Sequence, residues 1–378
     1  MRLHLEITGK CNLSCVHCYN KKYNNKEIIE QELSHKKWLK IIREANQLDC
    51  KRFTISGGEP LMYADARFEF LTELIRECKA PVILLTNGHL LTSVRLQELE
   101  RLNNLLAIRL SLDGLRSHNR FRIGSDYREI LQKIRIIRET TNLKVAVVTM
   151  LNKRNMGELV GLYRELKSLK IDRWNIDIPF YAGNYREGIK GFGQRNFKEI
   201  IRKIGELIKI YIGDNKPFQI GIVNIYKSEL AVVPYESFDF NSHPCSYSDI
   251  VCVKPNGDIN VCAALDLRLS NIKEDGSLNS AVEHARVHPF YAIKIKDITQ
   301  CQNCRYIKVC GSGCRADAKY LTGLETLPDP ICCSLWPLVE QEILPILPAN
   351  EKDTIINLLK EEGDLPYTHE SVEEIIRQ

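Results

Sequence analysis

The chain has 378 residues, which is too long for one small core and suits a large α/β domain with an appendage. Hydrophobic residues make up 44% and charged residues 27% of the sequence, as is ordinary for a globular protein. No apolar run is long enough to span a bilayer, and the first residues lack the apolar core of a signal peptide. These features exclude a membrane partner from the expected functions and predict a cytosolic (cytoplasmic) location. The fourteen cysteines then favour metal binding over a disulfide framework.

Residues 1 to about 210 alternate between strand patterns and amphipathic helix patterns. Strands are expected at Leu3–Thr8, Arg52–Ser56, Val82–Thr86, Ala107–Leu112, Lys144–Met150 and Arg173–Ile178. Helices are expected at Lys36–Leu48, Ala66–Cys78, Ser93–Leu102, Tyr127–Thr140 and Met156–Leu169. Six alternations predict an α/β fold with a parallel sheet, and six units rather than eight indicate a partial, TIM-like (β/α)6 barrel. In such folds the chemistry lies at the C-terminal ends of the strands.

The rest of the chain divides by composition. Residues 211–244, with several glycines and prolines, are expected to form a bridge. Residues 245–337 hold nine of the fourteen cysteines and are expected to form a separate unit. The charged tail, residues 338–378, is expected to be helical. Cys50 and Cys78 fall in helical apolar patterns and are predicted to be buried core residues.

Three cysteines follow the first predicted strand with the spacing C-x3-C-x2-C: Cys11, Cys15 and Cys18. Three thiolates can hold a four-iron, four-sulfur cube and leave one iron free to bind the amino and carboxylate groups of a small molecule. A zinc site is the alternative, and it would need a fourth ligand such as His17. The C-x3 spacing directly after a barrel strand makes zinc the poorer interpretation.

A second motif, Ser56-Gly57-Gly58-Glu59-Pro60, follows the second predicted strand. Paired glycines let a ligand approach the backbone, and a carboxylate can accept hydrogen bonds from an ammonium group. An ordinary turn is the alternative if the motif is taken alone. Further polar residues end the third and fourth strands or follow them: Asn87, Ser111, Asp113 and the run His118-Asn119-Arg120-Phe121-Arg122.

Together these motifs resemble those of the radical S-adenosylmethionine (SAM) enzymes, whose cluster transfers one electron to SAM and releases a 5′-deoxyadenosyl radical. The resemblance implies that the cluster ligands are Cys11, Cys15 and Cys18, and that SAM is held by Gly57, Gly58, Glu59, Pro60, Asn87, Ser111, Arg122 and His17. In that assignment the Gly57–Pro60 run takes the amino group and Ser111 lies near the ribose. Arg122 pairs with the carboxylate through its fork, and His17 stacks near the adenine.

The sequence departs from the family at Asn119, which replaces the aspartate of a His-Asp-x-x-Arg pattern. Arg116 and Arg120 therefore stay open as rivals of Arg122.

The C-terminal cysteines resemble those of the SPASM domain, an extension of radical SAM enzymes that holds two auxiliary four-iron clusters. The resemblance assigns the first auxiliary cluster to Cys245, Cys252, Cys262 and Cys314, and the second to Cys301, Cys304, Cys310 and Cys332. Four cysteines each would leave no open iron, which suits electron transfer. The Asp329-Pro330 context favours Cys332 over Cys333. Two structural zinc sites are the alternative, but they leave the N-terminal motifs unexplained.

The net charge of +5 describes the chain without clusters. Three bound clusters would bring the total near zero, so no nucleic-acid partner is expected.

The resemblance implies an oxidoreductase that modifies a peptide or protein. The leading hypothesis is a radical SAM maturase that oxidatively modifies a ribosomally made peptide by a cross-link, a thioether or a similar change. It would take electrons from a donor such as flavodoxin or ferredoxin. Peptide maturases often carry a leader-binding domain before the barrel, whereas here the first strand begins at Met1. The precursor is therefore expected to be bound by a separate leader-binding protein, by the barrel mouth or by the tail. Candidates to meet the substrate are Asp177, Tyr181, Tyr185 and Arg186.

Three alternatives stay open. One is a small-molecule or cofactor-maturing enzyme. Another is a sulfatase-type enzyme that forms formylglycine, but such enzymes have an aspartate directly after the cysteine that aligns with Cys262, where this chain has Ala263, with Asp266 three positions on. The third is a non-enzyme, either an iron–sulfur electron carrier or a zinc-binding adaptor, which would not cleave SAM.

Overall fold

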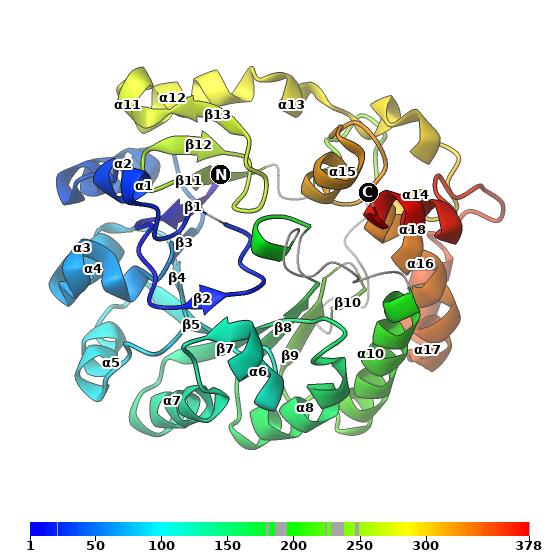
Figure 1. Cartoon of the computed structure of the whole chain (residues 1–378), viewed down its shortest axis with the longest axis horizontal. Helices are drawn as coiled ribbons and strands as arrows, with labels where there is room; N and C mark the ends of the chain where they lie inside the picture. The colour runs from blue at the N-terminus through cyan, green and yellow to red at the C-terminus, as the bar shows by residue number, and fades with distance from the viewer. Residues whose placement is uncertain are drawn as a thin grey trace.

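One curved sheet of 11 strands runs through the computed structural model (Figure 1), which describes residues 1–20, 22–178, 181–185, 195–223, 225–227, 238–245 and 249–377. In spatial order the strands are β10 (Tyr226–Lys227), β9 (Gln219–Ile222), β8 (Arg173–Asp177), β7 (Lys144–Met150), β5 (Leu105–Ser111), β4 (Val82–Thr86), β3 (Phe53–Ser56), β1 (Arg2–Glu6), β11 (Ile250–Val253), β12 (Asp258–Asn260) and β13 (Arg268–Asn271). Every neighbouring pair from β9 to β11 is parallel, and the pairs beyond them at both ends are antiparallel. The parallel strands confirm the predicted α/β fold.

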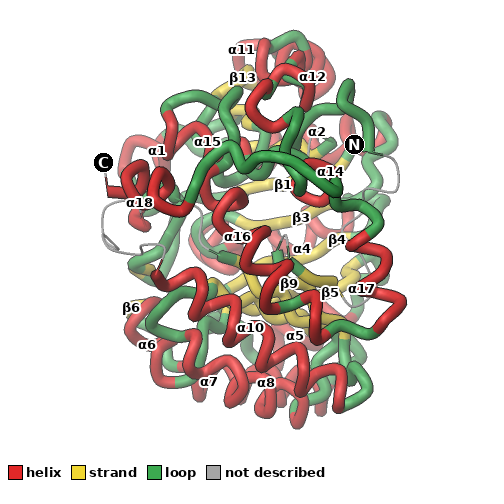
Figure 2. Tube along the Cα trace, turned by 90° about the vertical axis from the view of Figure 1, so that its right-hand side faces the viewer, coloured by secondary structure: helices red, strands yellow, loops and turns green. Residues whose placement is uncertain are grey.

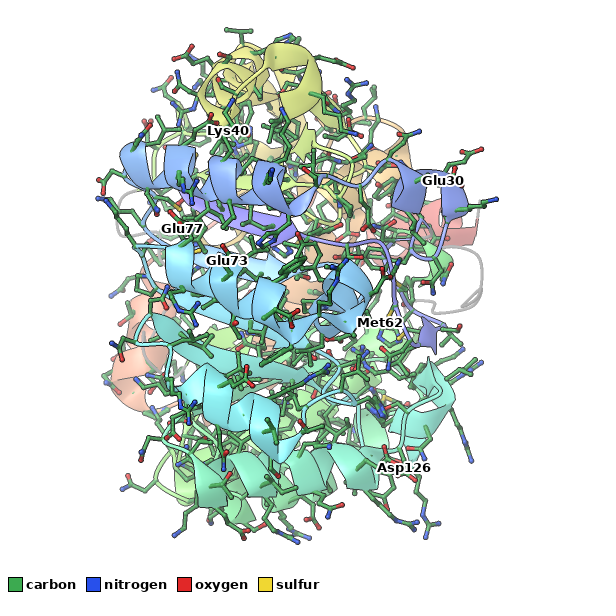
Figure 3. The ribbon with its side chains drawn as sticks, turned by 90° about the vertical axis from the view of Figure 1, so that its left-hand side faces the viewer. Glu30, Lys40, Met62, Glu73, Glu77 and Asp126 are labelled. Atoms are coloured by element: carbon green, nitrogen blue, oxygen red, sulfur yellow. The ribbon has the colours of Figure 1, made fainter. Side chains whose placement is uncertain are left out.

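Amphipathic helices ring the outside of the parallel strands in Figure 1: α2 (His35–Gln47), α4 (Phe68–Glu77), α5 (Ser93–Glu100), α7 (Tyr127–Thr140), α8 (Leu159–Ser168) and α10 (Arg195–Gly213). Ser34 precedes helix α2 and caps it by accepting from the Lys37 amide, and the helix buries Trp38 against the sheet. Its outer face is charged. Figure 3 shows Glu73 and Glu77 of α4 on the side of α2 that faces α4, and Lys40 on the opposite side of α2. Arg43 Nε of α2 lies 3.0 Å from Glu77 Oε1.

The C-terminal part is mostly helical: α11 (Ile272–Asp275), α12 (Leu278–Arg286), α13 (Pro289–Ala292), α14 (Ile307–Cys310), α15 (Arg315–Thr322), α16 (Pro330–Glu342), α17 (Ala349–Ile356) and α18 (His369–Arg377). Figure 2 shows α16 beside α10, so this part packs directly on the barrel. Within the described residues, no helix has the length and apolarity needed to cross a membrane.

Short elements complete the chain: α1 (Lys26–Glu30), α3 (Tyr63–Ala66), α6 (Arg116–Phe121), and 3-10 turns at Pro60–Met62, Met156–Glu158, Ile295–Asp297, Thr299–Cys301 and Leu344–Ile346. A separate two-stranded sheet joins β2 (Ser14–Cys15) to β6 (Arg122–Ile123).

All six predicted strands and all five predicted helices are present, and Val82–Thr86, Lys144–Met150 and Tyr127–Thr140 have the predicted bounds. The predicted helix at Met156–Leu169 begins instead as a 3-10 turn before α8. Cys50 and Cys78 are buried, as predicted, but they lie just after α2 and α4 rather than within them. Part of the tail is helical, as expected, in α17 and α18.

The sheet extends beyond the six predicted strands at both sides. Strand β9 lies within the predicted bridge and adds a further parallel strand next to β8. Its four residues include Gly221, so its strand pattern is weak and its pairing depends on the exposed edge of β8. On the other side β11 continues the sheet next to β1, so one sheet spans the barrel and the start of the cysteine-rich part.

Candidate active site

The loop after β1 carries the three cysteines of the first motif, and Figure 1 shows it crossing the middle of the helix ring. Burial raises the pKa of Cys11 to about 11 and that of Cys18 to about 12, and the neighbouring Cys15 contributes to both shifts. The thiols are therefore close together. Asn24, at φ +61°, fixes the loop because its side chain accepts from the Cys11 amide and donates to the Cys11 carbonyl, each over 2.8 Å. The structure thus brings the three predicted ligands together.

The small β2–β6 sheet places Arg122 directly opposite Cys15. Arg122 Nη1 lies 3.8 Å from Cys15 Sγ, and Nε donates to Asp113 Oδ2 over 2.7 Å. The Arg122 side chain is 13% exposed and that of Asp113 is fully buried. Arg116 and Arg120 are exposed, so of the three rival arginines Arg122 is the one at the cysteine loop.

Asp113 is the centre of this polar cluster. Its Oδ1 accepts from the Met150 amide over 2.8 Å, and its Oδ2 lies 3.2 Å from His17 Nε2. Burial alone would raise the pKa of Asp113, but the Arg122 guanidinium, two histidines and the Met150 amide together outweigh burial and hold that pKa below its usual value. Asp113 is therefore a carboxylate that orients both Arg122 and His17.

His17 is buried at 6% exposure and packs edge-on against Phe121, with ring centroids 5.8 Å apart. Burial lowers the pKa of His17 to about 4, so its ring is neutral at neutral pH. Its Nε2 faces Asp113. Throughout the described part of the chain, no three His, Cys, Asp or Glu side chains are arranged to hold a single metal ion.

The paired glycines pack against the cysteine loop. The amides of Gly58 and Glu59 donate to the carbonyls of Thr8 and Lys10, each over 2.8 Å. A Cβ at Gly57, whose φ is +149°, would lie 2.6 Å from the Thr8 carbonyl oxygen, and a Cβ at Gly58 would come closer than 3.0 Å to that of Lys10. Both glycines are therefore required by chain packing at the base of the loop.

The Glu59 carboxylate joins its own loop, which follows β3, to the end of β4. It accepts from the Thr86 hydroxyl over 2.7 Å, from the Asn87 amide over 2.8 Å and from the Leu61 amide over 3.1 Å. Burial raises the pKa of Glu59 to about 7. Pro60, also buried, begins the 3-10 turn that follows Glu59.

Asn87 and Ser111 lie at neighbouring strand ends. The Asn87 side chain donates to Asn12 Oδ1 in the cysteine loop over 2.7 Å. Ser111 is the half-buried last residue of β5 and stands opposite Val148 of β7. The sequence-predicted SAM residues therefore gather at one end of the barrel strands, as expected for this fold.

A segment after β8, residues 181–185, also touches the cysteine loop. The Asn184 amide donates to the Cys18 carbonyl over 2.8 Å, and its side chain donates to the Cys15 carbonyl over 3.1 Å. The Tyr181 amide donates to Asp317 Oδ1 of α15 over 2.9 Å. This segment therefore joins the cysteine loop to the cysteine-rich part. Asn184 and Asp317 belong to no motif, so the sequence carried no signal for them.

The substrate candidates lie around the same segment. Tyr181 and Tyr185 form an edge-on pair with centroids 6.2 Å apart, and Tyr185 is buried. Asp177 ends β8, and burial raises its pKa to about 6. Arg186 lies outside the described residues.

In the cysteine-rich part, one cavity is lined by all four residues assigned to the second auxiliary cluster and by Cys333, that is, by Cys301, Cys304, Cys310, Cys332 and Cys333. Tyr306 and Trp336 close its apolar side. Asp329 caps α16 by accepting from the Ile331 amide over 2.8 Å, and it also accepts from the Cys314 amide over 2.8 Å. A cavity surrounded by thiols fits an iron–sulfur group.

The four residues assigned to the first auxiliary cluster come from separate elements. Cys252 lies on β11, Cys262 follows β12 and Cys314 directly precedes α15. Burial raises the pKa of Cys252 and Cys314, and the nearby Cys262 raises both further. Cys245 and Cys262 both lie near Tyr291, whose pKa burial raises to about 12. These thiols gather in one region and suit the same kind of group.

Asp266 does not join these thiols. Its side chain is 62% exposed and lies 2.8 Å from Lys22 Nζ on the surface.

Comparison with known proteins identifies relatives of this chain. Residues 5–166 match the profile of the Radical SAM superfamily. The chain is 25% identical to an AdoMet-dependent heme synthase of Methanosarcina barkeri over 344 residues, which cover 86% of this chain and 94% of that protein. It is 24% identical to a PqqA peptide cyclase of Rhizobium meliloti over 345 residues, which cover 88% of this chain and 86% of that protein.

Among solved structures, native anSMEcpe with bound AdoMet and the Cp18Cys peptide superposes with a TM-score of 0.70 at 17% identity, covering 94% of this chain and 99% of that one. At that identity the likeness concerns the fold. The profile match and the fold agree, and the chain therefore carries a radical SAM domain on a partial TIM barrel.

Proposed function

We propose that this enzyme is a radical SAM maturase that abstracts hydrogen from a ribosomally made peptide and modifies it oxidatively. The observation that carries the proposal is the presence of two kinds of thiol set on one chain. The three cysteines in the barrel leave one iron of a cluster open to SAM, and the four-cysteine sets in the C-terminal part leave none open.

Cys11, Cys15 and Cys18 would hold a [4Fe–4S] cluster, which supplies the electron that cleaves SAM when it is bound. Arg122, oriented by Asp113, would pair with the SAM carboxylate, and the Gly57–Pro60 run would bind the amino group. Ser111, Asn87 and His17 would line the remainder of the SAM site. The barrel wall and the segment 181–185 would keep water away from the radical.

The eight assigned C-terminal cysteines would hold two further [4Fe–4S] clusters. An oxidation that removes two hydrogens from the peptide requires more than abstraction of one hydrogen atom. The resulting substrate radical must also lose an electron and a proton. Closed clusters are suited to accepting that electron. An external donor such as flavodoxin or ferredoxin would supply the first electron.

A peptide substrate is favoured by two relatives. One is named for a peptide cyclase, and one related fold was solved with a bound peptide. Tyr181, in the segment 181–185, and Asp177, at the end of β8, are the residues of this chain that we expect to face the substrate. A leader-binding protein would present the precursor if the chain itself does not bind it.

The test is exact mass measurement of a short peptide encoded beside this gene. The peptide is incubated anaerobically with reconstituted enzyme, SAM and a strong reductant, and we expect it to lose two hydrogens. Cys15→Ala, which removes one barrel ligand, is the control and should give neither 5′-deoxyadenosine nor product. An unchanged peptide in the presence of accumulating 5′-deoxyadenosine would count against a peptide substrate.

A second candidate is maturation of a small molecule or cofactor. It is favoured by the heme synthase relative, which aligns over most of both chains. This candidate predicts turnover without any peptide. Formylglycine formation is less favoured because Asp266, the nearest acidic residue after Cys262, faces solvent.

A further inference from the structure

A buried polar bridge connects the cysteine loop of the barrel to the first auxiliary cysteine set. It consists of Tyr19, Glu6 and Lys254. The Tyr19 hydroxyl donates to Glu6 Oε1 over 3.0 Å, and Lys254 Nζ donates to the same oxygen over 2.9 Å. Lys254 Nζ also donates to the Ala263 carbonyl over 3.1 Å. Tyr19 directly follows Cys18, and Ala263 directly follows Cys262, so the bridge touches both cysteine regions.

The sheet explains how residues so distant in sequence meet. Strands β1 and β11 are parallel, with His4 opposite Cys252 and Leu5 opposite Val253. The next positions in this register are Glu6 and Lys254, which brings their side chains together at the C-terminal ends of the two strands. Lys254 also follows Cys252 by two residues, and side chains two residues apart in an extended strand point to the same face.

Both charges of the bridge are out of water. The Glu6 side chain is fully buried and that of Lys254 is 13% exposed. Within the described residues, the second carboxylate oxygen of Glu6 has no hydrogen-bond partner. Removing two charges from water costs free energy, and the attraction between them does not always offset that cost. A gain in folding stability is therefore a weak explanation for the buried Glu6–Lys254 pair. A charge in such surroundings acts strongly on neighbouring charges because water does not screen it.

We propose that the Lys254 ammonium, held in place by Glu6, sets the reduction potential of the iron–sulfur group at Cys245, Cys252, Cys262 and Cys314. The inference rests on the proposed function, because it requires that these cysteines bind a cluster. Reduction adds one negative charge to the cluster. A fixed positive charge nearby favours the reduced state and raises the potential, whereas the Glu6 carboxylate opposes it. Lys254 is thus a positioning residue for electron transfer rather than a catalytic one.

The test is a redox titration of the reconstituted holoenzyme followed by electron paramagnetic resonance. Lys254→Met should make the first auxiliary cluster at least tenfold harder to reduce, which is a downward shift of about 59 mV for one electron. Glu6→Gln should shift the potential in the opposite direction. Lys254→Arg keeps the charge and should stay near the wild-type value. Lys273→Met, on the exposed side chain that donates to the Gln31 carbonyl, is the matched control and should shift nothing.

Iron content separates the possible failures. A Lys254→Met protein that binds full iron at an unchanged potential overturns the inference and leaves the proposed function intact. The Lys254→Met protein could instead lose iron while Lys254→Arg and Glu6→Gln leave the potential unchanged. That result would give the bridge a structural role and would also overturn the inference. A wild-type protein that binds iron for only one cluster refutes the premise shared with the proposed function. The peptide mass assay on the wild-type protein tests the proposed function separately, because it requires no measurement of these potentials.

Discussion

The Arg122 guanidinium is paired with the carboxylate of Asp113, with Nε 2.7 Å from Oδ2, while its Nη1 faces the sulfur of Cys15 over 3.8 Å. The pair is buried, and it places a positive charge next to a predicted cluster ligand. Asp113 was visible in the sequence only as part of a strand-end motif, and its pairing with Arg122 shows how the arginine is oriented.

Asp113→Asn should destabilise the protein by about 3–5 kcal/mol, because removal of one partner leaves the buried Arg122 charge uncompensated. Chemical denaturation would measure the change in the free energy of unfolding. Asp266→Asn, in an exposed pair with Lys22, is the comparison and should cost at most about 1 kcal/mol. Equal effects of the two substitutions would contradict the role of Asp113.

Glu59 should make stability depend on pH. Burial raises its pKa from the ordinary 4.5 to about 7. Between these values the folded protein binds more protons than the unfolded chain, so the free energy of unfolding falls as the pH rises, by up to about 1.4 kcal/mol per pH unit. Glu59→Gln removes this contribution. We expect wild type to lose stability relative to Glu59→Gln between pH 5 and 7 in urea denaturation, and parallel pH profiles would argue against the shifted carboxyl.

Gly58→Ala should displace the base of the cysteine loop, because the new Cβ would collide with the Lys10 carbonyl oxygen. We expect a lower melting temperature and loss of the iron bound by the barrel cysteines. Gly213→Ala is the control: among the described residues, no heavy atom beyond its chain neighbours and its own helix backbone lies within 4 Å of the added Cβ. Alanine in place of a helical glycine is neutral or stabilising by about 0.4–1 kcal/mol. Retention of full iron content in Gly58→Ala would show that the loop can adjust.

Cys332 and Cys333 both line the C-terminal cavity, but they should not be equivalent. The Cys332 thiol is within hydrogen-bonding reach of that of Cys310. We therefore expect Cys332→Ser to lose about four irons per chain, the content of one [4Fe–4S] cluster, and Cys333→Ser to retain them. Iron and sulfide analysis after reconstitution would show which of the two cysteines is a cluster ligand. Loss of iron in Cys333→Ser but not in Cys332→Ser would make Cys333 the ligand instead.

Local sequence patterns were sufficient for the barrel strands and their helices. Lys144–Met150 and Tyr127–Thr140 carry their periodicity and boundary residues within a few positions, so short-range physics determines them. The same holds for the cysteine motifs, because residue type and spacing express the ligand chemistry directly. Strand β9 lacked such a pattern, because its place depends on the free edge of β8 rather than on its own four residues.

The sequence by itself thus determined six barrel strands, five of the helices around them and the candidate cysteine ligands. Only the tertiary structure decided what holds them in place: the pairing of Cys15 with Arg122, the attachment of Asn184 to the cysteine loop, and the contact of Glu6 with Lys254. The physical reason is distance along the chain. These contacts join residues separated by about a hundred positions or more, and they form only when the sheet brings its distant strands side by side.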